Sequence, residues 1–445
     1  MRKEYDIIIA GAGIGGLALA YFLSKDGYKV LCVEKRPGAG GLARCFRAGK
    51  SHLEIYYHHI FRTDEYLYGL LSELGLEGQV EEKAASTGLY DGERLVPFSK
   101  PLNLMLLPHI GLRQKLNFGL KLLNLSVSRA GGELHDVTAV KWLRDSFGEE
   151  VSRFLWEPLL RSKFGEDYSD ISAAWIFERI KKRFGSRKKD KSREVLAYIK
   201  GGTQVLIDKL MDEVRGKGGE FIFGSGIESF IMKNGACMGI TAGGDEFHSS
   251  KTISTVAVPE FTDILNRSRT PHSGWKDDIE DYIKRCSRIK YKSVISLVLE
   301  TRKELSGYYW VNIIDETVPF PVLVNQTFLV PPVEYGGNYI TYVAQYVDTD
   351  SGLLDSSPEH VMEKMRPFLE KIVPDIKEKE IVRYHVFCDR YATPVYSTGF
   401  NDIVPDLKTP VKGLFMANNT QVYPESRNLD MTVRIARKVH NLITG

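Results

Sequence analysis

The sequence predicts an α/β protein with at least two domains, and three observations support this. The chain begins with a strand, a glycine-rich turn, a helix and a second strand in close succession. Residues 282–350 contain repeated runs of β-branched and aromatic side chains, which indicate an antiparallel sheet. The length of 445 residues exceeds what one hydrophobic core normally supports, so a second domain is expected.

The first unit of the chain has the pattern of a nucleotide-binding βαβ motif. Residues 5–10 are a short apolar run that is typical of a buried parallel strand. The turn after them has the spacing Gly-x-Gly-x-x-Gly, and an apolar stretch at 17–23 predicts a helix. A second strand at 29–33 ends in Glu34. This order of elements predicts a Rossmann-like dinucleotide site rather than an incidental glycine-rich turn.

The residues of this motif have separate physical roles. Gly11 permits the tight turn, Gly13 lets a pyrophosphate approach the backbone, and Gly16 lets helix and strand pack closely. The phosphates then lie at a helix N-terminus, where free N–H groups and the helix dipole favour an anion. The Glu34 carboxylate can accept hydrogen bonds from both hydroxyls of an adenosine ribose. No second unit of this kind follows, so one dinucleotide site is expected.

Bulk properties exclude several classes of function. The net charge of +3 is too small to indicate nucleic-acid binding. The five cysteines are scattered without a Cys-x-x-Cys pair, which argues against a disulfide framework and against a zinc site, so no metal is expected. This cysteine usage fits a reducing, cytoplasmic compartment. Neither a signal peptide nor a membrane-spanning helix is predicted.

The residues after Glu34 indicate which dinucleotide binds. Residues 34–44 read Glu-Lys-Arg-Pro-Gly-Ala-Gly-Gly-Leu-Ala-Arg. This segment resembles the motif extension of flavin amine oxidases, protoporphyrinogen oxidases, phytoene desaturases and UDP-galactopyranose mutases, in which it marks FAD. Glycines here would let the backbone run close to the ribityl-pyrophosphate, and Arg44 could place a fixed cation near phosphate or flavin. The alternative for Arg44 is an ordinary surface arginine.

Two later segments carry the same resemblance. Gly201-Gly202 precedes a helical pattern, and the strand after that helix leads to Ile227, a position that lies near the adenine in the resembled family. Residues 413–430 resemble the family's Gly-Leu-Phe-x-Ala-Gly-Asp strand and loop, with Asn418-Asn419 in place of Gly-Asp. The resemblance implies that the final helix, expected from about residue 429 to 443, points its N-terminus at the flavin. The dipole of that helix would stabilise negative charge on the ring.

The three segments together imply a discontinuous Rossmann-like FAD domain of the glutathione-reductase type, with an inserted α+β substrate domain. The FAD domain is expected at 1–85, 196–260 and 381–445, a helical substrate cap at 86–195, and an antiparallel-sheet substrate domain at 261–380. The cofactor-binding residues that we expect are Gly11, Ala12, Gly13, Ile14, Gly15, Gly16, Glu34, Lys35, Arg36, Gly40, Gly41, Leu42, Ala43, Arg44, His58, Ile227, Asn418, Asn419, Asp430, Met431 and Thr432.

Residues 45–61 predict a hairpin, whose second strand passes close to the isoalloxazine ring in the resembled family. On a regular strand, Tyr56 and His58 would share one face, and Tyr57 and His59 the other. Tyr57, His58 and His59 are therefore candidate catalytic residues, for substrate hydrogen bonding or proton transfer. The alternative is aromatic strand packing around a hydrogen-bonded core histidine.

Two surface patterns leave alternatives open. Leu112, Leu116, Leu120 and Leu123 recur at helical spacing on a basic helix, which could pack within the cap or lie in a membrane interface. Residues 181–193 are strongly basic. They predict either a solvated loop or a contact with anionic headgroups or a diphosphate-bearing substrate.

The resemblance implies an FAD-dependent oxidoreductase (an oxidase, desaturase or dehydrogenase) that transfers hydride from an apolar small molecule to flavin. Porphyrinogens, polyenes and amines are the expected substrate types, with oxygen or a quinone as electron acceptor. The alternative is a nucleotide-sugar mutase or isomerase of the UDP-galactopyranose mutase type. A flavin-binding scaffold without turnover is the third possibility.

Overall fold

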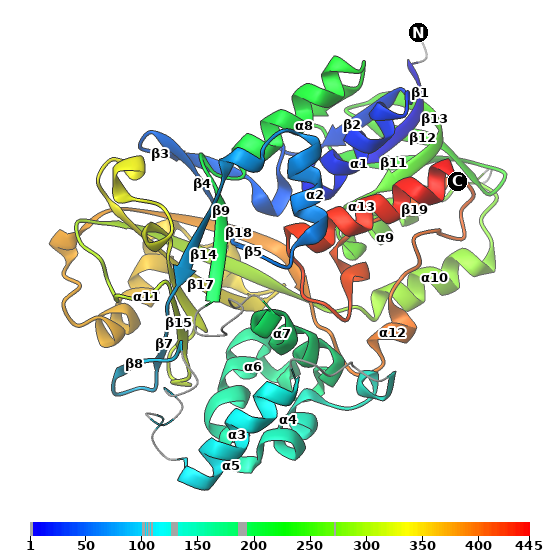
Figure 1. The fold of residues 1–445 in the computed structure, drawn as a ribbon. Coiled ribbons are helices and arrows are strands. Elements are labelled where there is room, and N and C mark those ends of the chain that lie inside the picture. The colour runs from blue at the N-terminus through cyan, green and yellow to red at the C-terminus, as the bar shows by residue number, and fades with distance from the viewer. Residues whose placement is uncertain are drawn as a thin grey trace.

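The computed structural model describes residues 3–99, 103, 105, 107, 110–125, 132–185, 194–270 and 273–445. Two large sheets and a group of helices make up this part of the chain (Figure 1). Both chain ends lie at the first sheet, so this sheet combines segments that are far apart in sequence (Figure 1). The α/β fold with a discontinuous first domain, which the sequence predicted, is confirmed.

The first sheet has the strand order β10-β2-β1-β13-β12-β11, with β19 also pairing with β13. Its centre is parallel, because β1 pairs in parallel with both β2 and β13. Ile7 and Ile9 of β1 pack on one face and Ile8 on the other, and all three are buried. The strands are β1 (Lys3–Ala10), β2 (Val30–Glu34), β10 (Glu220–Phe223), β11 (Ile227–Lys233), β12 (Ala236–Ala242), β13 (Asp245–Ser254) and β19 (Leu414–Met416).

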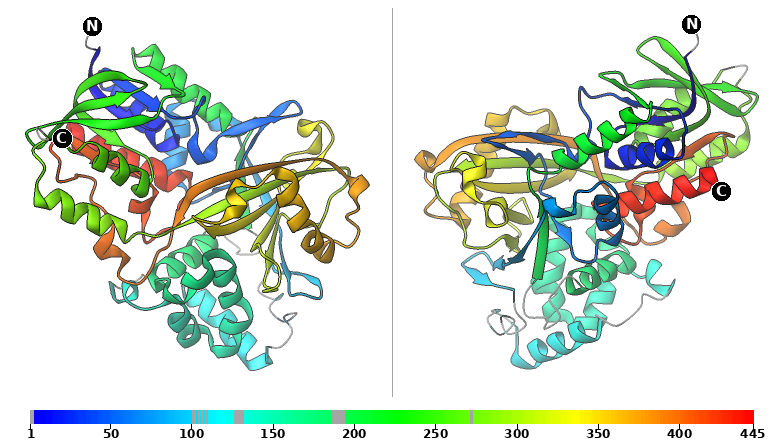
Figure 2. Two further views of the ribbon diagram at one scale, coloured as in Figure 1. Left: turned by 180° about the vertical axis from the view of Figure 1, so that it is seen from behind. Right: turned by 45° about the horizontal axis from the view of Figure 1, so that its top comes forward.

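Helices from both ends of the chain pack side by side on this sheet. The C-terminal helix α13 (Leu429–Thr444) contacts α1 (Ile14–Lys25), and α1 also contacts α8 (Gln204–Gly216) (Figure 2). A Cβ on Gly15 would lie 2.9 Å from Cγ2 of Thr432, so the two helices approach each other closely near their N-termini. The remaining helices around this sheet are α2 (Glu65–Glu73), α9 (Val258–Arg267), α10 (Asp277–Ser287) and α12 (Phe400–Ile403).

The second sheet has the order β18-β14-β17-β16-β15-β7-β8 and is antiparallel except for the β15–β7 pair. It extends beyond 261–380, because β7 and β8 come from the expected cap and β18 from the expected last part of the FAD domain. The long pairing of β18 with β14 holds residues 381–394 in this sheet. The strands are β7 (Thr87–Tyr90), β8 (Leu95–Pro97), β14 (Tyr291–Thr301), β15 (Trp310–Ile313), β16 (Val322–Asn325), β17 (Tyr339–Asp348) and β18 (Ile381–Pro394), covered by helix α11 (Pro358–Ile372).

Two small sheets connect these parts. The predicted hairpin is present as β3 (Cys45–Ala48) and β4 (Ser51–Glu54), but the second strand ends at Glu54. Residues 55–59 are therefore irregular, and the alternation expected for Tyr56 to His59 does not apply. The other small sheet has the order β5-β9-β6, formed by β5 (Ile60–Phe61), β9 (Glu194–Ile199) and β6 (Val80–Ala85).

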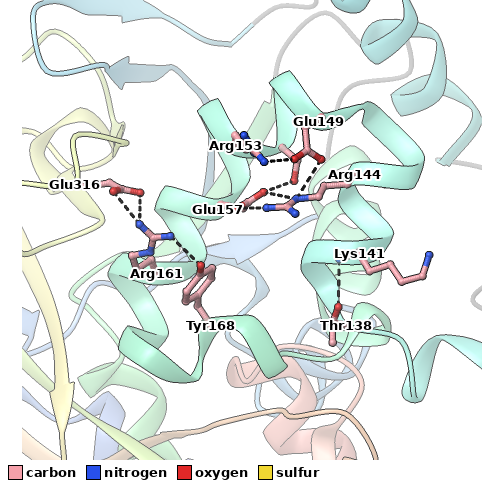
Figure 3. A network of polar contacts seen from close by, with 10 residues as sticks. Thr138, Lys141, Arg144, Glu149, Arg153, Glu157, Arg161, Tyr168 and Glu316 are labelled. Atoms are coloured by element: carbon pink, nitrogen blue, oxygen red, sulfur yellow. Dashed lines mark hydrogen bonds and ion pairs between the residues drawn. The ribbon is translucent and has the colours of Figure 1, made fainter.

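The helical cap lies below both sheets in Figure 1 and is held by ion pairs. Arg144 binds Glu157 through two hydrogen bonds of 2.9 Å, and Arg161 binds Glu316 at 2.8 and 2.9 Å (Figure 3). The second pair fastens the cap to the loop between β15 and β16. The cap helices are α3 (Leu112–Leu125), α4 (Ala139–Phe147), α5 (Glu149–Val151), α6 (Glu157–Phe164) and α7 (Ala173–Gly185).

The leucine stripe of α3 points away from the protein. Leu112, Leu116 and Leu120 are 66%, 55% and 65% exposed, whereas Phe118 is 1% exposed and packs in the core. The side chain of Leu123 lies outside the described part of the chain. Packing of α3 therefore depends on the Phe118 side of the helix and not on these three leucines. Within the described residues, no helix is both long enough and apolar enough to cross a bilayer.

Candidate active site

A cavity of about 580 Å³ lies where β1, α1 and the N-terminus of α13 meet. It is lined by residues from all three segments that the sequence analysis assigned to the cofactor domain. Most of the expected cofactor-binding residues line it: Gly11, Gly13, Ile14, Gly15, Gly16, Glu34, Lys35, Arg36, Gly40, Gly41, Leu42, Ala43, His58, Ile227, Asn418, Asn419 and Thr432. The structure thus brings the separate motifs together around one cavity.

The glycines of the turn differ in what surrounds them. Gly11 has a φ of 103°, which L side chains rarely adopt. A Cβ on Gly16 would lie 2.0 Å from the carbonyl oxygen of Gly11, so helix and strand can pack this closely only at glycine. A Cβ on Gly13 would meet only Cα of Gly41, at 3.8 Å. The backbone at Gly13 therefore faces open space, where a pyrophosphate can approach.

The Glu34 carboxylate is held in place by the backbone. It is 7% exposed, and its two oxygens accept hydrogen bonds of 2.9 Å from the N–H groups of Ala12 and Arg36. A carboxylate can accept about four hydrogen bonds, so capacity remains for two ribose hydroxyls. Glu34 is thus oriented for the role that the sequence predicted.

The N-termini of α1 and α13 both border the cavity. Gly13 caps α1 without a side chain, which leaves the first N–H groups of that helix available to a phosphate. Asn428 caps α13 by accepting from the N–H of Met431 at 2.9 Å. Asn428 and Thr432 line the cavity, so the positive end of the α13 dipole borders the same cavity as that of α1.

The two asparagines that replace Gly-Asp have different surroundings. Asn418 donates to the carbonyl of Val256 at 2.8 Å and accepts from the N–H of Thr420 at 3.0 Å, so it mainly fixes the loop. Asn419 accepts from the hydroxyl of Thr432 at 3.2 Å. Its Nδ2 has no partner among the described residues, which makes Asn419 the better candidate for a ligand contact.

Four of the expected cofactor-binding residues do not line this cavity. Ala12 and Arg44 instead contact residues that line it. The N–H of Ala12 donates to the Glu34 carboxylate, and the Arg44 guanidinium binds the Asp389 carboxylate at 2.8 Å. Asp389 itself lines the cavity. Asp430 is 1% exposed and accepts from a backbone N–H of α2, and its burial raises its pKa to about 6. Met431 lines a second cavity instead.

The second cavity, called here the chamber, has a volume of about 650 Å³. It borders the first cavity at residues 427–429 and His58, which line both. Tyr57, His58 and His59 all line the chamber, and their part in substrate hydrogen bonding or proton transfer stays a prediction. Its aromatic wall comprises Phe61, Phe98, Phe118, Trp156, Trp175, Trp310, Tyr346 and Tyr396.

His58 presents a hydrogen-bond acceptor at the border of the two cavities. Its Nδ1 lies 2.7 Å from the carbonyl oxygen of Tyr56. Because a carbonyl can only accept, Nδ1 carries the proton and Nε2 is left unprotonated. Burial lowers the pKa of His58 to about 4, so the ring is neutral at neutral pH.

The flanking candidates are held by aromatic contacts. The ring of Tyr57 lies edge-on to Trp310 at 5.2 Å, and burial followed by its neighbour Tyr346 raises the pKa of Tyr57 well above the usual value. His59 lies 3.0 Å from the hydroxyl of Tyr309, and burial lowers its pKa well below the usual value. Tyr57 is therefore a neutral hydrogen-bond donor and His59 a neutral imidazole.

A comparison with known families identifies the class of this site. The model of the family described as flavin containing amine oxidoreductase matches residues 14–426. The chain belongs to this family. Membership assigns the chain to the flavin-dependent oxidoreductases and implies a flavin cofactor. The cradle at Gly13, the uncapped N-terminus of α1 and the oriented Glu34 fit such a cofactor.

Relatives in this family catalyse different reactions. The chain is 22% identical over 246 residues to a 15-cis-phytoene desaturase from Synechococcus elongatus, covering 51% of each chain. The chain thus spans about half the length of this desaturase. Its match to an all-trans-retinol 13,14-reductase from Macaca fascicularis covers 15% of that protein. A putative protoporphyrinogen oxidase from Exiguobacterium matches 100% of this chain and 99% of its own, with a TM-score of 0.76 and 14% identity. A reduced UDP-galactopyranose mutase matches 99% of this chain and 93% of its own, with a TM-score of 0.75 and 16% identity. At these low identities the two structures show that they share the fold of this chain, and no more.

Several residues of the site are not among those expected from the sequence of this family member. Asp389 lies on β18, Lys163 on α6 and Arg179 on α7, and none of them belongs to a local motif. Arg427 lines both cavities, directly before the final helix. The position of Arg427 directly before the expected final helix is the one feature of the sequence that could have indicated its role.

The neutral state of His58 predicts a pH-dependent loss of stability. In the unfolded chain His58 takes up a proton near its ordinary pKa of about 6.5, whereas in the folded protein it does so only at about 4. Lowering the pH from about 6.5 to about 4 should therefore remove up to about 3 kcal/mol of stability that the H58Q variant does not lose. Urea unfolding of wild type and H58Q across this range measures the difference.

The exposed His360 provides a matched control for this experiment. H360Q should follow the wild-type profile at every pH. If H58Q and wild type had parallel profiles, His58 would not be held neutral by burial.

Proposed function

We propose that the chain is an FAD-dependent oxidoreductase that takes hydride from a small, largely apolar molecule bound in the chamber. The observation that carries this proposal is the border shared by the two cavities at His58 and residues 427–429. A flavin ring held by the first cavity would be accessible from the second at this border. The Glu34 carboxylate favours FAD over a smaller flavin, because its partner would be an adenosine ribose.

The protein contributes binding, orientation and charge. Bound FAD would supply the redox chemistry. The backbone at Gly13 and the N-terminus of α1 would hold the pyrophosphate, and the N-terminus of α13 with Arg427 would place positive charge at the border. Nε2 of His58 could accept a hydrogen bond or a proton there. The aromatic wall would exclude water from the reacting atoms.

Anaerobic titration of the FAD-loaded protein tests this function. A porphyrinogen, a polyene or an amine should bleach the flavin absorbance, and oxygen or a quinone should restore it. If the loaded protein were reduced by none of these classes, the oxidoreductase proposal would be wrong.

A nucleotide-sugar mutase remains the second candidate, because lysine and arginine side chains from the cap line the chamber. A diphosphate would fit such a lining. Binding of a UDP-sugar to the protein only after chemical reduction of the flavin would favour this candidate.

The exposed leucines of α3 support a peripheral membrane contact. Phe118 and Leu122 of this helix line the chamber, while Leu112, Leu116 and Leu120 face outward. The α3 sequence contains three cations and no carboxylate, which suits an anionic bilayer. An apolar substrate could then reach the chamber from the membrane.

Replacing Leu112, Leu116 and Leu120 together by serine should weaken binding to vesicles of anionic phospholipid by at least about tenfold, because each buried leucine contributes about 2 kcal/mol. Co-sedimentation measures this. V333S removes a different exposed apolar side chain and should sediment like wild type. Equal sedimentation of the triple variant and wild type would argue against membrane contact.

A further inference from the structure

The chamber has an excess of positive charge. Six lysine or arginine side chains and three glutamates line it. Two of the glutamates are already paired: Glu178 with Lys181 at 3.7 Å, and Glu425 with Arg434 at 2.7 Å. Glu178 offsets Lys181 of the lining, and Asp64 offsets Lys182 at 2.7 Å. No ion pair in the described part of the chain offsets Lys163, Arg179 or Arg427, and these three cations would repel a protonated amine.

Two of these cations lie together on the cap side of the chamber. Nζ of Lys163 lies 4.8 Å from the ring centre of Trp175 and 5.5 Å from that of Tyr346. Cζ of Arg179 lies 5.6 Å from the same Trp175 ring. Lys163 and Arg179 thus share one aromatic side chain, although they come from different helices.

Neither cation has a carboxylate partner in the described part of the chain. The contrast with the outer face of the cap is clear, since Arg144, Arg153 and Arg161 are all paired with glutamates there (Figure 3). Arg161 lies only two residues before Lys163 on α6. The cap thus pairs these three outward arginines with glutamates, whereas Lys163 and Arg179 have no carboxylate partner among the described residues.

A buried cation without a counter-ion is unfavourable, and an anion would offset its cost. Burial lowers the pKa of Lys163 well below its usual value, with smaller contributions from Arg179 and Arg427. The neighbouring Tyr57 keeps its hydroxyl proton and hydrogen-bonds Tyr346, so it adds no negative charge beside the two cations.

We propose that Lys163 and Arg179 bind an anionic headgroup, a phosphate or a carboxylate, of the molecule that occupies the chamber. The apolar part of that molecule then lies along the aromatic wall toward His58. This inference rests on the proposed function in taking the chamber as the substrate site. It narrows the substrate to an anionic amphiphile and excludes free amines.

Calorimetric titration of the FAD-loaded protein tests the headgroup site, because bound FAD blocks the pyrophosphate cradle. Inorganic pyrophosphate and succinate are the two anionic probes, and benzylamine is the cationic one. At least one anion should bind, and K163M and R179Q should each weaken it by about tenfold or more. K163R keeps the charge and should retain most of the affinity.

R161Q is the matched control, because it removes a cation from the same helix outside the chamber and should leave anion affinity unchanged. The flavin-to-protein ratio and melting temperature of each variant establish that it is folded. The inference is overturned if benzylamine binds and neither anion does, or if both substitutions leave anion affinity unchanged. The two anionic probes distinguish a phosphate from a carboxylate headgroup.

Failure of this inference is distinguishable from failure of the proposed function. Loaded protein that binds anions but is reduced by no substrate class would contradict the oxidoreductase function alone. Loaded protein that amines reduce, and that binds neither anion, would contradict the headgroup site alone.

Discussion

Replacing Gly13 by aspartate is expected to give a folded protein that has lost its flavin. The backbone of Gly13 has φ −67° and ψ 172°, which any residue can adopt, and a Cβ there would meet only Gly41, at 3.8 Å. The new side chain would extend into the cavity, where it would occupy the pyrophosphate position and repel it electrostatically. FAD affinity should fall by at least about 100-fold, since like charges in contact cost several kcal/mol.

The measurement is the flavin-to-protein ratio after dialysis against FAD, together with circular dichroism to establish folding. G38D is the matched control, because Gly38 has open space around it, is exposed and does not line the cavity. G38D should bind FAD like wild type. Normal flavin content in G13D would show that the pyrophosphate lies elsewhere.

Much of the first cavity could be predicted from the sequence, because many of the residues that shape it are neighbours in the chain. Gly16 packs on Gly11, and Glu34 binds Ala12 and Arg36, so these contacts lie within or next to one βαβ unit and their spacing in the sequence is also their geometry. Ala12 and Arg44 do not line the first cavity but contact residues that do. The sequence alone could not distinguish them from the lining residues. For Arg44 that difference depends on Asp389, which lies on a strand of the other sheet.

The chamber was less predictable because its residues come from separate elements. Lys163 and Arg179 meet only through the packing of α6 and α7 around Trp175, and no spacing rule connects them. The end of β4 at Glu54 had a similar effect, because it allowed His58 and Tyr57 to line the same chamber. The leucines of α3 had the predicted spacing, but spacing alone does not say whether a stripe faces protein or solvent.

Glu54 is expected to be a major determinant of stability, although no sequence motif points to it. It is 0% exposed and accepts hydrogen bonds from the N–H of Thr203 at 2.7 Å and the hydroxyl of Tyr198 at 2.8 Å. These bonds join β4 to β9 and to the start of α8. E54A would leave both donors unpaired beside a new cavity, and should lower the free energy of unfolding by about 3 kcal/mol or more.

E54Q separates hydrogen bonding from charge. Burial raises the pKa of Glu54, so a neutral side chain carries no desolvation cost there. The amide oxygen of E54Q can accept from Thr203 while its NH₂ group donates to the Tyr198 oxygen, which can also act as an acceptor. E54Q should therefore change stability by less than about 1 kcal/mol.

E81A removes an exposed carboxylate from β6 that binds Lys200 at 3.0 Å, and should change stability by no more than about 0.5 kcal/mol. Denaturant unfolding of the FAD-loaded variants tests this order, and an E54Q variant as unstable as E54A would mean that the negative charge itself holds these elements together.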